Sequence, residues 1–283
     1  MNNKLVFSGH ETFHCKELWL KKGYDFVKRD GKFTDQACID LGVGRNMVSS
    51  IRFWLKAFDI IDFKNENTTE IANFIFNKAN GKDKYLENEA SLWLLHYLLI
   101  VSDYSSIYSI IFNEFRKLKP EFSKENFITY IEGVDSGLNQ NTLGKDFSVF
   151  LRTYHSKNEK DIEDSFSGIL TDLELVQEVK KNNSITKYTV QNNKQEDIPI
   201  ELILFIILEN KEYGKSISFK NLYSEFNSVG NIFAFSKDQL EKKLIAISEK
   251  YNSIMYSNDS GIKELQFKSK KPNSFDILSE YYE

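Results

Sequence analysis

Two histidines and a glutamate near the N-terminus, His10, Glu11 and His14, follow the HExxH spacing of zinc hydrolases. On a helix this spacing puts both imidazoles on one face as metal ligands, and the glutamate acts as a general base. Gly9 directly precedes the pattern, and no third ligand follows at the spacing that such enzymes use. We therefore predict no metal site here and expect His10 and Glu11 to cap the first helix.

Charged clusters further along the chain are weaker candidates for a catalytic or metal site. Lys145, Asp146 and Arg152 are best explained as the outer face of a helix that buries Phe147 and Phe150. The sequence contains no P-loop, no GxGxxG and no nucleophile elbow, which argues against nucleotide-driven and α/β-hydrolase chemistry. A nuclease that uses Mg²⁺ holds the ion with carboxylates. Four acidic residues could do so if they came together in the fold, namely Asp161, Glu163, Asp164 and Asp172.

The clearest positioning elements lie in residues 33–62, where the spacing predicts a short helix, a tight turn and a longer helix. Gly42 and Gly44 suit the turn, because glycine tolerates positive φ. An apolar face then recurs at helical intervals through Met47, Val48, Ile51, Trp54, Leu55 and Phe58. The opposite face carries hydrogen-bond donors at Arg45, Asn46, Ser49, Ser50, Arg52 and Lys56.

This donor-rich face has two interpretations. In a helix-turn-helix it enters the DNA major groove, where it meets phosphates and base edges. In an ordinary αα-hairpin it is merely a solvated face, and such hairpins are common folding units.

The hydrophobic pattern predicts a mostly α fold with small β wings. We expect a winged helix-turn-helix over residues 1–80, a helical middle domain over 81–195 and a winged-helix-like domain over 196–283. In the first domain a helix over 12–29 precedes the helix-turn-helix, and the wing would consist of a strand at 60–63 and a return segment at 69–76, which fits helix and strand equally.

The middle domain should centre on residues 92–100, which are apolar nearly all round and predict a buried helix. A polar stretch at 77–84 separates this domain from the first. Toward its end the pattern predicts a helix over 162–179 and a strand over 184–191.

In the C-terminal domain the predicted order of elements is three helices followed by a β-hairpin, which is the order of a winged helix. We expect helices at 200–208, 218–226 and 236–250, then strands at 253–257 and 262–268. Lysines exceed acids on the third helix and the hairpin, so we take Lys242, Lys243 and Lys263 as further DNA-binding candidates. The alternative is a charged face that serves solubility.

Composition limits the class of protein. The 283 residues carry 37 Lys and Arg against 41 Asp and Glu, a formal net charge of −4, so any contact with DNA must come from local patches. Cys15 and Cys38 form no CxxC pair, which suits a reduced cytoplasm. The N-terminus lacks the apolar run of a signal peptide, and we expect no membrane association.

Three ordered segments give the chain a family resemblance. They are FSGHETF at residues 7–13, WLKKGYD at 19–25 and LGVGRNMV at 41–48. In this order they resemble the bacterial domain-of-unknown-function family 4007. The likeness continues to residues 146–154 and fades after Lys187, so that the lysine-rich C-terminal part lies outside it.

Members of that family are typically encoded in phage-defence operons beside a PAPS-reductase-like protein, and one branch is the SspB component of DNA phosphorothioation, regarded as a nickase. The resemblance implies a DNA-binding component of such a system, which nicks one strand for sulfur modification. Its implied partners are double-stranded DNA, a PAPS-reductase-like sulfur transferase and an ATPase, with Mg²⁺ if it is a nuclease.

No catalytic position follows from the resemblance, and His10 and Glu11 are the polar pair to test first. The alternative function is a non-enzymatic winged-helix scaffold or a transcriptional regulator.

Overall fold

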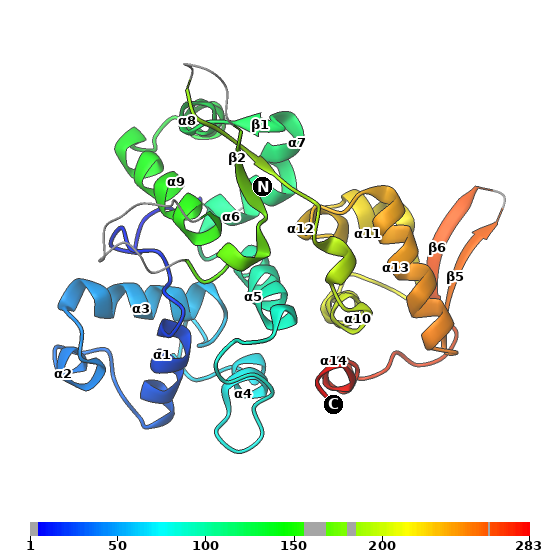
Figure 1. Ribbon diagram of the computed structural model, residues 1–283, viewed down its shortest axis with the longest axis horizontal. Helices are drawn as coiled ribbons and strands as arrows, with labels where there is room; N and C mark the ends of the chain where they lie inside the picture. The colour runs from blue at the N-terminus through cyan, green and yellow to red at the C-terminus, as the bar shows by residue number, and fades with distance from the viewer. Residues whose placement is uncertain (1–4, 156–167, 180–184, 260) are drawn as a thin grey trace. The chain divides into compact units, whose positions relative to one another are not determined.

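The computed structural model describes residues 5–155, 168–179, 185–259 and 261–283. This part of the chain is predominantly helical and contains two antiparallel sheets of three strands each. The chain forms two compact units, Met1–Gln191 and Asn192–Glu283 (Figure 1). The predicted fold class of helices with small sheets is confirmed, whereas the boundary near residue 80 and the winged-helix assignments stay predictions.

The first unit contains most of the helices. They are α1 (Trp19–Lys28), α2 (Ala37–Leu41), α3 (Arg45–Ala57), α4 (Glu70–Phe76), α5 (Glu89–Val101), α6 (Ser106–Ile110), α7 (Arg116–Leu118), α8 (Lys124–Val134) and α9 (Gln140–Tyr154). A π-helical turn, η1 (Ile111–Phe115), joins α6 to α7, and a 3-10 turn is η2 (Thr171–Leu173). The strands are β1 (Glu121–Phe122), β2 (Val176–Val179) and β3 (Lys187–Val190).

The turn between α2 and α3 matches the predicted helix-turn-helix spacing. Gly42 ends α2 in the left-handed region at φ +59°, and α3 begins at Arg45. The apolar face of α3 is buried, with Ile51 and Trp54 fully inaccessible. The preceding helix, α1, starts at Trp19 rather than at residue 12, because residues 11 and 12 adopt positive φ values of 49° and 64°.

The predicted wing after α3 is reduced to one bridge. Ile61 pairs with Thr68 in an isolated antiparallel bridge, and the return segment is the helix α4 rather than a strand. The side chain of Thr69 caps α4 by accepting a hydrogen bond from Ala72 N, which favours the helix over an extended strand.

Helix α5 forms the centre of the first unit's aromatic core. From Leu92 to Ile100 every residue except Tyr97 is buried, as predicted. His96 Nδ1 lies 2.8 Å from Tyr154 Oη of α9, and its ring packs edge-on against Phe112. In the described chain, no single helix is long and apolar enough to cross a membrane, although α5 and the segment Ser106–Leu118 pass that test as a pair bent by 100°.

The small sheet of the first unit overturns one prediction. Residues 162–179 were expected to be helical, but β2 occupies the end of this range and pairs with β3, while residues before 168 lie outside the described chain. Glu174 adopts φ 52° directly after η2, which stops helical continuation and leads the chain into β2. β3 confirms the predicted strand and also pairs with β1.

The second unit contains five helices, a short 3-10 turn and three strands among its described residues. They are η3 (Gln195–Asp197), α10 (Ile200–Glu209), β4 (Ser216–Ser218), α11 (Phe219–Ser224), α12 (Val229–Ile232), α13 (Lys237–Lys250), β5 (Ile254–Asp259), β6 (Ile262–Phe267) and α14 (Ser274–Tyr282).

The predicted hairpin is present in this unit as β5 and β6, and β4 adds a third strand beside β6. The nine-residue helix α14, which packs against α10, was not predicted from the sequence. The ring of Phe275 on α14 lies 5.4 Å from that of Phe205, and Asn273 caps the helix at Asp276 N.

The turn between α2 and α3 gives a stability prediction. Replacing Gly42 by alanine should lower the free energy of unfolding by about 1 kcal/mol, because a Cβ is strained at this left-handed φ although no atom lies within 4 Å. Gly44→Ser is the matched control in the same turn, and its hydroxyl should cap α3 and slightly raise stability. Urea unfolding of both variants checks this, and equal stability of Gly42→Ala and wild type would contradict it.

Candidate nucleic-acid interface

The outward face of α3 displays most of the donors that the sequence predicted. Arg45, Asn46, Ser49 and Arg52 are exposed, and Lys56 is partly buried. The prediction that Ser50 belongs to this exposed face is wrong, because its side chain is fully buried. Its position between Met47 and Trp54 at helical spacing puts it on the apolar face instead.

Ion pairs partly neutralise this face. Arg45 Nη2 lies 3.2 Å from Asp35, while Arg52 Nη2 and Lys56 Nζ both lie 2.6 Å from Glu66 Oε1. Burial acts to raise the pKa of Glu66, but hydrogen bonds from Lys56 and Arg52 outweigh it and lower that pKa. The exposed Arg45–Asp35 pair contributes about 1 kcal/mol or less, whereas the Lys56–Glu66 pair is largely buried, with 12% and 25% of the two side chains exposed.

The C-terminal lysines make contacts within the second unit. Lys243 Nζ donates to the carbonyl oxygens of Glu196 and Ile198 at 2.7 and 2.6 Å, and burial lowers its pKa. Lys263 pairs with Glu241 at 2.6 Å. Lys242 is the most exposed of the three and lies 3.8 Å from Glu196 Oε1. Lys243 and Lys263 thus join parts of this unit, whereas the role of all three lysines in DNA binding stays a prediction.

His10 lies in a buried hydrogen-bonded node rather than at a helix cap. Its Nε2 lies 3.0 Å from Asp146 Oδ1, and its Nδ1 accepts a hydrogen bond from Thr12 N at 3.1 Å. These partners fix the tautomer, with the proton on Nε2 donated to the carboxylate. The ring stacks on Trp54 at 6.3 Å and is 3% exposed.

The node corrects two sequence-based expectations. His10 and Glu11 do not cap α1, which begins at Trp19, and Asp146 is 1% exposed rather than on the outer face of its helix. Both ring nitrogens of His10 are engaged, while Glu11 is exposed. The geometry therefore gives His10 a structural role.

The described residues do not fit a metal centre. Within 5–155, 168–179, 185–259 and 261–283, no group of three His, Cys, Asp or Glu side chains comes together that could hold a metal ion. Of the four carboxylates considered for Mg²⁺, Asp172 lies on η2, and Asp161, Glu163 and Asp164 lie outside the described chain.

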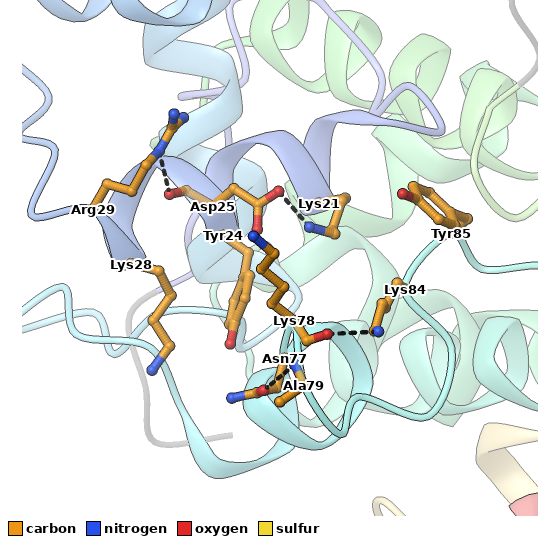
Figure 2. A pocket seen from close by; sticks show the side chains of 10 residues that line it. All are labelled: Lys21, Tyr24, Asp25, Lys28, Arg29, Asn77, Lys78, Ala79, Lys84 and Tyr85. Carbon is orange, nitrogen blue, oxygen red and sulfur yellow. Dashed lines mark hydrogen bonds and ion pairs between the residues drawn. The ribbon is translucent and has the colours of Figure 1, made fainter.

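A basic groove that the sequence analysis missed lies in the first unit (Figure 2). Its volume is about 1090 Å³, and it runs between α1 and the loop at 77–88 that follows α4. Five cationic side chains and a single carboxylate line it: Lys21, Lys28, Arg29, Lys78, Lys84 and Asp25. Tyr24 and Tyr85 add two aromatic rings.

The loop that forms one wall of this groove is held by its own hydrogen bonds. Asn77 Oδ1 accepts from Ala79 N at 2.9 Å, and the buried Asp83 carboxylate accepts from Glu87 N and Asn88 N at 2.9 and 3.0 Å. A Cβ at Gly81 would come within 2.5 Å of Asn77 backbone atoms, so the turn requires glycine. From the sequence this stretch was expected to be a polar separator between domains, although its Asn-x-x-x-Gly turn and Asp83 are typical of a folded loop.

These features define a predominantly helical protein whose first unit presents an exposed α3 face and an electropositive groove. The family model "Protein of unknown function (DUF4007)" matches residues 7–282, and the chain belongs to this family. The match includes the second unit, so the expectation that the likeness fades after Lys187 is wrong. Comparison with curated proteins gives no match.

Two solved structures share the fold. A crystal structure of SspB is 24% identical with a TM-score of 0.85, and a magnesium ion-bound SspB crystal structure is 22% identical with a TM-score of 0.84. Each alignment covers 98% of this chain and 88% of the other. At these identities the similarity is one of fold.

The buried node gives a second prediction. Asp146→Asn should lower the free energy of unfolding by about 3 kcal/mol. The amide NH2 that replaces Oδ2 would face the Ser8 N–H, so that two donors meet, and the bond from His10 Nε2 would lose its charged acceptor. Asp40→Asn, on the exposed side of α2, is the matched control and should change stability by about 0.5 kcal/mol or less. Equal unfolding curves for the two variants in urea would contradict the role of this node.

Proposed function

We propose that this protein is the DNA-binding component of a phosphorothioation-type phage-defence system in the cytoplasm. It engages duplex DNA through α3 and works with a PAPS-reductase-like sulfur transferase and an ATPase. Membership of the DUF4007 family and the fold shared with SspB support this proposal. The observation that carries it is the exposed donor set at the start of α3, formed by Arg45, Asn46 and Ser49.

The first turn of α3 suits a DNA phosphate. Within the described chain, no side chain caps this turn, since Gly44 is the N-cap residue, so its backbone N–H groups face outward at the positive end of the helix dipole. Neither Gly42 nor Gly44 has another atom within 4 Å of an added Cβ, which means that the DNA backbone can approach closely. Arg45 and Arg52 lie about two helical turns apart on the outer face and would flank the bound strand.

The proposal stops at binding. Strand nicking is implied by the family resemblance, but the described residues bring together no group of three potential metal ligands, and His10 is buried. The alternative remains a non-enzymatic scaffold or a transcriptional regulator, which would use its winged helices for protein contacts or for operator recognition.

Duplex binding tests the proposal. The double variant Arg45→Ala/Arg52→Ala should bind random-sequence duplex DNA about tenfold more weakly at low salt, because two phosphate contacts are lost. The slope of log affinity against log salt should become shallower by about 1.8. Fluorescence anisotropy at several salt concentrations measures both quantities.

A charge-matched control uses two exposed lysines outside α3, as Lys119→Ala/Lys211→Ala, and should leave duplex affinity unchanged. Wild-type affinity in the arginine variant would overturn the assignment of α3. Failure of the wild-type protein to bind any DNA would overturn the proposed function.

A further inference from the structure

We propose that the basic groove of Figure 2 binds a short stretch of unpaired DNA, with its phosphates on the lysines and one base stacked on Tyr85. This inference rests on the proposed function insofar as DNA is the partner. It goes further by placing a second DNA-binding surface apart from α3. It also specifies unpaired DNA as the ligand of that surface, whereas α3 would bind duplex DNA.

The charge of the groove favours a polyanion. Its five cations face one carboxylate, whereas the whole chain carries a net charge of −4. That carboxylate, Asp25, forms an ion pair with Lys21 one helical turn away. Lys84 Nζ donates to the carbonyl oxygen of Lys78 at 2.7 Å, which holds its ammonium group at the groove wall. A local surplus of this size concentrates phosphates.

The arrangement of the cations favours a chain over a single ion. Figure 2 shows Arg29 and Lys28 toward one end of the groove and Lys84 with Tyr85 toward the other, with Lys78 between them. A lone oxyanion would be held by donors that converge on one point. An elongated row of cations instead matches successive phosphates along a strand.

Tyr85 makes an unpaired strand the better fit than a duplex. Its side chain is 66% exposed although it is large and aromatic, and the loop that carries it is fixed by the Asp83 hydrogen bonds. Bases in a duplex are stacked on one another, so only an unpaired base can offer its face to this ring. Tyr24 differs, because its hydroxyl donates to Asn73 and its buried ring forms the groove wall.

The groove is also preorganised. One wall is the helix α1, packed against α3 through Gly23 and Leu55, and the other is the loop closed by Asn77 and Asp83. Binding therefore need not order either wall, so that the interaction energy is available for affinity.

The first experiment tests the stacking. Anisotropy with labelled oligothymidylate of about 12 nucleotides should show roughly tenfold weaker binding for Tyr85→Leu and near wild-type binding for Tyr85→Phe, which keeps the ring. Duplex affinity should be unchanged in both variants. Phe226→Leu, an exposed aromatic of the second unit, is the matched control and should have no effect.

The second experiment tests the phosphate contacts. Lys28→Ala/Lys78→Ala should weaken binding of oligothymidylate and make its salt slope shallower by about 1.4, since each single-strand phosphate contact contributes about 0.7. The duplex affinity of this variant should remain close to that of the wild type.

The two proposals fail in different ways. Wild-type oligothymidylate binding by Tyr85→Leu and by Lys28→Ala/Lys78→Ala would overturn the groove proposal, even if the α3 variant loses duplex binding as expected. A lysine variant that loses duplex and single strand equally, with no effect of Tyr85→Leu, would also overturn it, because the groove would then hold duplex phosphates. Absence of binding to either form of DNA would instead overturn the proposed function.

Discussion

The hydrogen bond between His10 and Asp146 holds together segments of the first unit that are far apart in sequence. The Asp146 carboxylate, on α9, also accepts from Ser8 N, while the imidazole of His10 stacks on Trp54 of α3. A carboxylate that is 1% exposed is tolerated only because these donors replace water. The N-terminal segment is thereby fixed between α9 and α3, and the outward face of α3 depends on this support.

The same unit distributes its surface charge in two ways. On α3 the cations are paired with acids, as with Arg52, Lys56 and the shared Glu66, so the positive charge of this face is partly neutralised. In the groove beside α1 the cations outnumber the acids and surround an exposed aromatic ring. Since the chain as a whole is acidic, the DNA binding that we propose must arise from such local features. We therefore assign the two surfaces to different forms of the partner that we propose, duplex and unpaired DNA.

Much of the fold followed from periodicity, because the apolar face of α3 and the buried α5 are long enough to show it. The failures were local: Glu174 in the left-handed region sent the chain into β2, and Ser50 lay on the apolar face by helical spacing despite its polar side chain. The site was less predictable. The HExxH pattern suggested a helix that positive φ values prevent, and the partnership of His10 with Asp146 spans 136 residues, which no local pattern encodes. The groove likewise joins α1 to a loop that sequence alone presented as a polar separator.

We propose that the first unit binds duplex and unpaired DNA through two separate surfaces. The most direct measurement compares the affinity of the intact protein for a blunt duplex with its affinity for the same duplex carrying a single-stranded tail at either end. Because α3 and the groove belong to one compact unit, occupancy of one raises the effective concentration of DNA at the other. We expect at least about tenfold tighter binding of one of the tailed duplexes. Equal affinity for the blunt duplex and both tailed duplexes would contradict it.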